Sequence, residues 1–172
     1  MNRKENTETV RIGEIALTKA WAGPIPVLYR EPESVLAKAE RKLAIFLTGL
    51  GGTKEKQAEF LKDIAERGYV ALAFDNAGHG ERGTEAPGDL VRRVFGNMRR
   101  EGWKVLGQTV LDTSAVIDWA VAALGVSDRV RMGGISMGGD ITIAAAGVDR
   151  RIVRAAPIIT TPDWLRPGMR EI

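Results

Sequence analysis

Four short apolar runs are spaced along the chain, at residues 43–47, 69–74, 129–133 and 153–159. Each is too short for a typical helix, so the runs favour strands. Continuous apolar runs of this kind are typical of strands that are covered on both faces. Nearer the N-terminus, residues 10–28 alternate between apolar and polar positions around a Gly-Pro break, which predicts an antiparallel hairpin.

Helical periodicity separates these runs. Residues 53–67 place their apolar side chains on one stripe, and apolar residues at steps of three and four predict a helix with one buried face up to residue 124. Residues 84–103 show no pattern clear enough to assign. A hairpin followed by alternating strands and helices predicts an α/β fold with a mainly parallel sheet, as a single domain over residues 1–172.

A Gly-Ile-Ser-Met-Gly sequence at residues 134–138 separates the third apolar run from an alanine-rich, helix-like segment at 140–147. Strand, Gly-x-Ser-x-Gly and helix together indicate a nucleophile elbow. The turn is so sharp that side chains two residues either side of the serine would collide, and glycines at 134 and 138 remove them. Ser136 is left exposed at the tip and is the candidate nucleophile.

The usual base is missing, because the chain contains one histidine, His79, and it precedes Ser136. A serine hydroxyl is a poor nucleophile until a neighbouring base, usually a histidine oriented by a carboxylate, takes its proton. Where the nucleophile stands on an elbow, the acid and then the histidine follow it in the sequence. The chain therefore supplies a nucleophile without its usual partners.

Composition excludes several classes of function. The 172 residues include no cysteine, which excludes disulfides, thiolate metal sites and thiol catalysis. A net charge of +3, from 25 basic and 22 acidic residues, is too weak and too scattered to favour nucleic acid. No clustered His, Asp and Glu indicate a metal, and no cofactor is expected. No apolar run approaches the roughly 20 residues of a membrane span, and the N-terminus has no signal-peptide core, so we expect a cytoplasmic protein without membrane contact.

Three segments carry a family resemblance. They are Gly-Ile-Ser-Met-Gly-Gly at 134–139, Asp-x-x-x-His-Gly-Glu-Arg-Gly at 75–83 and Thr-Pro-Asp-Trp at 161–164. Together they resemble the α/β-hydrolase superfamily, and more narrowly its bacterial esterase-like branch of small serine hydrolases. The elbow marks the whole superfamily, whereas the His-Gly-Glu-Arg-Gly loop is the more discriminating signal. The resemblance runs from about residue 10 to residue 165.

The resemblance implies eight strands, with the nucleophile after the fifth, the acid after the seventh and the histidine after the eighth. This chain stops just past the sixth, so we expect an apparently truncated sheet and a catalytic acid and histidine that lie outside the chain. It also implies an oxyanion hole built from the backbone N–H groups of Met137 and Leu50. Thr48-Gly49 stands where the family usually has His-Gly, a histidine that orders the loop.

Other polar residues lie near these motifs. His79 follows a neighbouring parallel strand and should share the rim that carries the nucleophile. We favour a loop-ordering or pocket-lining role for His79 over a role as substitute base. Asp75 is interpreted as a turn-former that hydrogen-bonds its own loop, and Glu81 and Arg82 as a local ion pair. Trp164 is a candidate pocket-lining residue, with a purely structural role as the alternative.

Two functions follow. The first is a serine hydrolase of carboxylesterase type that acts on a small ester through an acyl-enzyme on Ser136. The second is a catalytically silent α/β module that binds a partner or ligand. It is motivated by residues 153–159, which would form an apolar sheet edge if nothing paired with them, and such edges invite pairing. Pro157 removes only one donor there. We therefore expect self-association, or a complementing C-terminal segment, at that edge.

Overall fold

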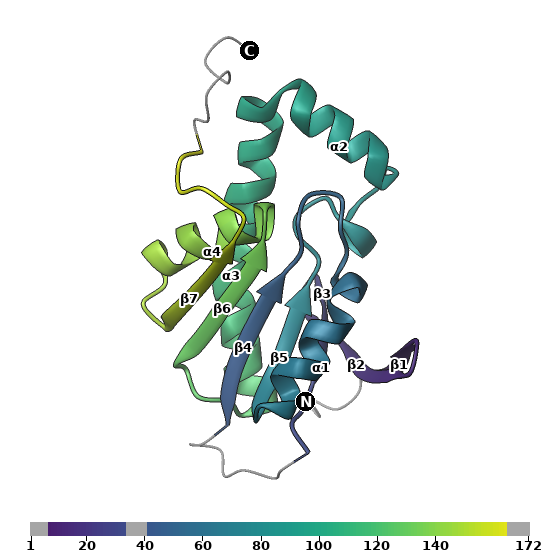
Figure 1. Ribbon diagram of the computed structural model, residues 1–172, viewed down its shortest axis with the longest axis vertical. Helices are drawn as coiled ribbons and strands as arrows, with labels where there is room; N and C mark the ends of the chain where they lie inside the picture. The colour runs from purple at the N-terminus through teal and green to yellow at the C-terminus, as the bar shows by residue number, and fades with distance from the viewer. Residues whose placement is uncertain (1–6, 34–40, 165–172) are drawn as a thin grey trace.

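A seven-stranded mixed sheet forms the centre of the molecule (Figure 1). The computed structural model describes residues 7–33 and 41–164. The strands lie in the order β1-β2-β3-β5-β4-β6-β7. Their bounds are β1 Glu8–Ile12, β2 Ile15–Ala22, β3 Ile25–Arg30, β4 Lys42–Leu47, β5 Tyr69–Phe74, β6 Val130–Ile135 and β7 Ile152–Ile158. Strands β5, β4, β6 and β7 are mutually parallel, and β1, β2 and β3 are antiparallel to their neighbours. The α/β class with a parallel core and an antiparallel N-terminal part is confirmed.

The N-terminal part contains one strand more than the single hairpin that was expected. The second turn lies at Gly23-Pro24, as the sequence indicated, and Gly23 has a φ of 63°. An earlier turn at Gly13, with a φ of 59°, divides the first half of the segment into β1 and β2. Glycine adopts this left-handed backbone without the steric penalty of a Cβ, which is why both tight turns carry one.

Helices cover both faces of the sheet. They are α1 Ala58–Glu66, α2 Pro87–Gly96, α3 Trp103–Leu124 and α4 Met137–Val148, with short helical turns η2 Lys54–Gln57, η3 Gly80–Arg82 and η4 Met98–Gly102. Strand β5 shows how the faces are divided. Its Ala71 and Ala73 pack with α1, whereas Val70, Leu72 and Phe74 belong to the larger core with α3 and α4. The expected burial of this strand on both faces is confirmed.

The segment that sequence patterns left unassigned forms a cap over the carboxyl end of the sheet. Helix α2 and the π-turn η4 lead into α3 above the strand ends (Figure 1). Pro87 stands in the first turn of α2, where its missing N–H costs nothing. Leu90 and Val94, one turn apart, are the side chains of α2 that join the core. Two buried residues in ten explain why the periodicity was too weak to recognise.

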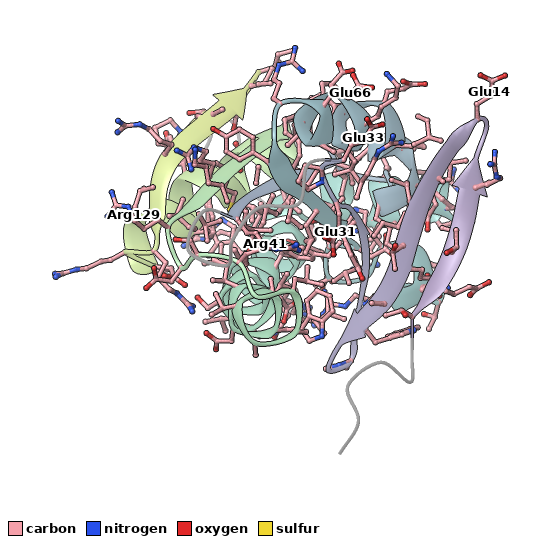
Figure 2. All side chains as sticks on the ribbon, turned by 90° about the horizontal axis from the view of Figure 1, so that it is seen from below. Glu14, Glu31, Glu33, Arg41, Glu66 and Arg129 are labelled. Carbon is pink, nitrogen blue, oxygen red and sulfur yellow. The ribbon has the colours of Figure 1, made fainter. Side chains whose placement is uncertain are left out.

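The opposite end of the molecule carries charged side chains of both signs. Figure 2 shows Arg41 beside Glu31, and their side chains are 2.8 Å apart. In the described part of the chain β7 is an edge strand, and its residues 154–158 are exposed. None of the described helices is both long enough and apolar enough to cross a membrane.

Candidate active site

Ser136 lies at the sharp turn between β6 and α4. Its backbone has a φ of 54° and a ψ of −118°, a conformation that costs a non-glycine residue roughly 1–3 kcal/mol. A Cβ on Gly134 would lie 2.5 Å from the backbone of Gly138, as the expected collision requires. A Cβ on Gly138 would instead lie 2.5 Å from the carbonyl oxygen of Leu47. The elbow is therefore packed against itself and against the end of β4.

The loop after β4 runs beside the serine. A Cβ on Gly49 would lie 3.5 Å from the Ser136 Cβ, and the loop then turns through a 3.1 Å hydrogen bond from the Gly52 N–H to the Gly49 carbonyl. Within the described residues, the Leu50 N–H has no hydrogen-bond acceptor. Met137 is the first residue of α4, where an N–H has no partner inside the helix. Two donors are thus available near the serine.

A pocket that is partly open to solvent lies in front of Ser136. Four of the predicted site residues line it together: Ser136, Leu50, Met137 and Trp164. The cap supplies further apolar walls that sequence reasoning missed, namely Val94, Phe95, Met98 and Trp103, and α3 adds Leu106. Phe95 is 60% exposed at this pocket, and the Trp103 indole N–H donates to the Trp164 carbonyl at 3.2 Å. The structure therefore places the elbow, the loop after β4 and the cap around one pocket.

His79 is not among the residues that line this pocket. Its ring is 2% exposed and both nitrogens are occupied. Nε2 accepts the Gly51 N–H at 3.0 Å, and Nδ1 lies 2.9 Å from the Ala77 carbonyl oxygen, to which it donates. Burial lowers the pKa of His79, although the Ala77 carbonyl and the Asp75 carboxylate act in the opposite direction. These contacts are those of a residue that orders its loop, and not of one that lines the pocket.

A buried ion pair joins the segments that follow β4 and β5. Lys54 is 1% exposed, and its ammonium lies 2.8 Å from the carboxylate of Asp75, which is 0% exposed. The same ammonium contacts Glu81 at 2.6 Å. Burial acts to lower the pKa of Lys54, but its hydrogen bonds to Asp75, Glu55 and Glu81 outweigh burial, so the pKa is raised and the ammonium stays charged.

These contacts extend one expectation from the sequence and correct another. Asp75 does accept the Glu81 N–H of its own loop at 3.1 Å, but its main partner is Lys54, from the loop after β4. Glu81 and Arg82 do not pair with each other. Glu81 binds lysines, and Arg82 binds Asp112 at 2.7 Å. The pairing was missed because the partners are distant in sequence and a buried lysine has no local pattern.

Asp140 is a second residue whose role could not be found from the sequence. It is buried in the first turn of α4 and lines the pocket. Its carboxylate accepts the Thr160 hydroxyl and, at 3.2 Å, the Thr161 N–H. Asp140 therefore ties the segment after β7, which leads to Trp164, to the helix that begins at the elbow.

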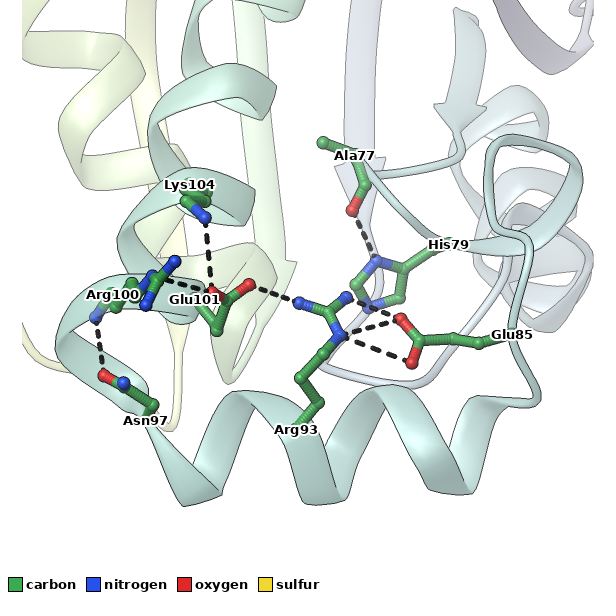
Figure 3. Close-up of polar contacts among 8 residues, drawn as sticks. All are labelled: Ala77, His79, Glu85, Arg93, Asn97, Arg100, Glu101 and Lys104. Atoms are coloured by element: carbon green, nitrogen blue, oxygen red, sulfur yellow. Dashed lines mark hydrogen bonds and ion pairs between the residues drawn. The ribbon is translucent and has the colours of Figure 1, made fainter.

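Ion pairs hold the cap in place. Figure 3 shows Arg93 of α2 between Glu85, which precedes the helix, and Glu101 of η4, each 2.5 Å away. Lys104 of α3 reaches the same Glu101 at 3.2 Å. Single exposed ion pairs stabilise a fold little, but a shared network fixes geometry. In the stretch from residue 7 to 33 and from 41 to 164, no cluster of three or more His, Asp or Glu could hold a metal ion.

Comparison with known proteins decides the family. Residues 43–168, well over half of the chain, match the family model described as the alpha/beta hydrolase fold. The chain belongs to the α/β-hydrolase family. The fold, the elbow and the resemblance expected from the three sequence segments agree with this membership.

Several relatives of this α/β hydrolase are longer than the chain. YcjY, an uncharacterized protein of Escherichia coli K12, is 38% identical over 105 residues, which make up 59% of this chain and 29% of YcjY. TT1662 from Thermus thermophilus matches with a TM-score of 0.67 and 26% identity, over 97% of this chain and 62% of its own. Est1E from Butyrivibrio proteoclasticus, solved with ferulic acid bound, matches with a TM-score of 0.59 and 20% identity, over 89% of this chain and 52% of its own. This match supports the fold alone. The chain thus spans less than two thirds of each.

Proposed function

We propose that this α/β hydrolase is a serine hydrolase of carboxylesterase type. The observation that carries the proposal is the strained Ser136, which lines an apolar pocket together with Leu50 and Met137, whose N–H groups are available as donors. Backbone strain of this kind persists where the surrounding structure enforces it, and it is concentrated at functional sites. Donors arranged in advance for a developing oxyanion are a main source of catalysis in acyl transfer.

The reaction proceeds in two steps. The Ser136 oxygen attacks the ester carbonyl carbon while a base takes its proton, and the Leu50 and Met137 N–H groups stabilise the negative oxygen. The tetrahedral intermediate expels the alcohol, which receives the proton, and leaves an acyl-enzyme. Water then attacks the acyl group and releases the acid and the free serine.

The base and its carboxylate come from outside these 172 residues. His79 is the only histidine of the chain, and both of its nitrogens already have partners. The proposal assigns the missing pair to a segment or subunit that reaches the exposed edge of β7, beside the elbow. Support for this place is the 2.9 Å hydrogen bond from the Ser136 N–H to the Ile158 carbonyl, which joins the elbow to the end of that strand.

The substrate is a small, uncharged ester with an apolar acyl or alcohol group. The described pocket walls are mainly aliphatic and aromatic side chains, and no lysine or arginine is among the lining residues that the structure describes. Asp140, the one acidic residue among them, is engaged with the segment after β7. A substrate carboxylate would therefore lose its hydration without gaining a cationic partner, which costs free energy.

Covalent capture tests the proposal better than turnover. An enzyme without its base still hydrolyses its substrate about 10³–10⁴ times faster than water does, through its oxyanion hole and substrate binding alone. An enzyme without its serine keeps a similar residual rate. Hydrolysis rates of the chain and of Ser136→Ala would therefore differ little. The acyl-enzyme differs, because only Ser136 can carry it. Without the base the acyl-enzyme forms slowly, since hydroxide or a buffer base in solution must take the serine proton, but it is also released slowly and therefore accumulates.

The experiment is to incubate the chain with p-nitrophenyl butyrate and to measure its intact mass. We expect one butyryl group on the wild-type chain and on Ser127→Ala, a control serine in the loop before β6, but none on Ser136→Ala. The anionic analogue p-nitrophenyl hemisuccinate should acylate the chain more slowly. No adduct, or an adduct that survives in Ser136→Ala, would contradict the proposal.

The second candidate function is a catalytically silent α/β module that binds a partner or ligand. The exposed residues 154–158 on the edge strand β7 and the absence of a free histidine among the described residues favour it. It predicts no acyl adduct, together with self-association or capture of a complementing segment at β7. A concentration-independent monomer in sizing experiments would count against the edge as an interface.

A further inference from the structure

Three residues of the loop after β5 hold three residues of the loop after β4. The Asn76 side-chain amide donates to the Thr48 carbonyl at 3.2 Å, and the Gly51 N–H donates to His79 Nε2 at 3.0 Å. The Lys54 N–H donates to Asp75 Oδ1 at 2.9 Å. These contacts lie before and after Leu50, whose own N–H has no acceptor within the described residues. One loop thus fixes the direction of an N–H group that belongs to the other.

The contact closest to Leu50 in sequence has a strict chemical requirement. Because the Gly51 N–H is a donor, His79 Nε2 must carry no proton, and the proton of the neutral ring must lie on Nδ1. The Nδ1 proton is bound by the Ala77 carbonyl, as shown in Figure 3. A second proton on Nε2 would place two donors against each other in a buried site. The loop can therefore keep this shape only while His79 is neutral.

We infer that His79 is a positioning residue for the oxyanion hole: neutral His79 holds the Gly51 N–H and so directs the Leu50 N–H toward Ser136, and protonation of His79 releases the loop and weakens the site. This role rests on the proposed function of Ser136. It differs from catalysis by a base, because His79 exchanges no proton with the substrate.

The groups around His79 determine the pH at which its contact with Gly51 is lost. Burial is the largest influence and lowers its pKa; Asp75 at the end of β5 and Glu85 before α2 favour the protonated ring, and Arg82 of η3 opposes it. Glu85 is itself paired with Arg93. The folded-state pKa lies below the ordinary 6.5, so the contact is intact at pH 7 and is lost as the pH falls through that lower value.

Nuclear magnetic resonance tests the contact directly in the ¹⁵N-labelled chain. As the pH is lowered from 8, we expect the His79 ring nitrogens and the Gly51 amide to titrate with one shared midpoint below 6.5. At pH 8 the ring should carry its proton on Nδ1. The Gly147 amide, at the far end of α4, serves as the control and should not follow this midpoint. A Gly51 signal that ignores the titration of His79, or an Nε2-protonated ring at pH 8, would overturn the inference.

The conservative variant His79→Gln supplies the functional readout, because its side-chain oxygen can accept the Gly51 N–H and does not titrate in this range. The rate of butyrylation of wild-type chain relative to His79→Gln should fall about tenfold for each pH unit below the His79 midpoint. A ratio that stays constant as the pH falls through the measured His79 midpoint would contradict positioning by neutral His79. If Ser136 forms no adduct at all, the proposed function fails, while the shared midpoint of His79 and Gly51 still decides the contact.

Discussion

Adding one methyl group at Gly138 should destabilise the molecule and widen the site. A Cβ there would lie 2.5 Å from the Leu47 carbonyl oxygen and 2.7 Å from that of Thr48, both of which are backbone atoms. The overlap can be relieved only by moving α4 away from the end of β4. Overpacking of this kind costs about 1–3 kcal/mol, and for a chain of this size each kcal/mol lowers Tm by roughly 2–4 °C.

Gly147 provides the matched control on the same helix. It is exposed, and a Cβ there would have no neighbour within 4 Å. Alanine in place of glycine in a helix stabilises it by about 0.5–1 kcal/mol. Both positions lie in α4 and share this gain, so Gly138→Ala should be less stable than Gly147→Ala by the cost of overpacking, about 1–3 kcal/mol.

Thermal and urea-induced unfolding of both variants measures this difference. Gly138→Ala should also acylate more slowly than wild type with p-nitrophenyl butyrate, because the Leu50 and Met137 N–H groups move apart, whereas Gly147→Ala should not. Equal stabilities of the two variants would refute the close packing of the elbow against β4. A destabilised Gly138→Ala with an unchanged acylation rate would refute the link between that packing and the oxyanion hole.

Two further predictions concern charged groups. Lys54→Met should cost about 3–5 kcal/mol, because it leaves Asp75 buried without its cation. Lys62→Met, at an exposed ion pair, should leave the urea midpoint close to that of wild type; equal urea midpoints of the two variants would contradict the buried pair. A hydrogen bond from the Arg151 side chain lowers the pKa of Asp149 to about 2. Its contribution of about 2 kcal/mol is present above pH 4 and lost as the pH falls through 2, so the stability gap between wild type and Asp149→Asn should close in acid urea titrations.

The parts of the fold that the sequence predicted are those with a strong local pattern. The apolar run at 69–74 coincides with β5, and the runs at 43–47 and 153–159 lie within one residue of β4 and β7 at either end. Strands β4 and β5 are buried on both faces, so their composition alone distinguishes them. The apolar composition of residues 153–159 also located β7, although residues 154–158 are exposed in the described part of the chain, where burial on both faces was expected. The elbow was recognised because the close approach of Gly134 to Gly138 operates within five residues, whereas the contact of Gly138 with the end of β4 could not be seen in the sequence.

The parts that were not predicted depend on contacts between distant segments. The cap at 84–103 buries few side chains of its own and becomes a pocket wall only when it lies over the elbow. The pair of Lys54 and Asp75 joins residues 21 positions apart. The role of Asp140 depends on a threonine 20 positions later. Neither pair has a periodicity, so only the tertiary structure could reveal them.

Labelling with a fluorophosphonate tests the central claim, that Ser136 is a nucleophile facing a prepared oxyanion hole. After treatment, the chain would be digested and the modified peptide sequenced by mass spectrometry, with Ser136→Ala and Ser127→Ala treated in parallel. We predict one phosphonyl group per chain, located on Ser136 and retained in Ser127→Ala. An unmodified wild-type chain, or a phosphonyl group on any other residue, would contradict the account.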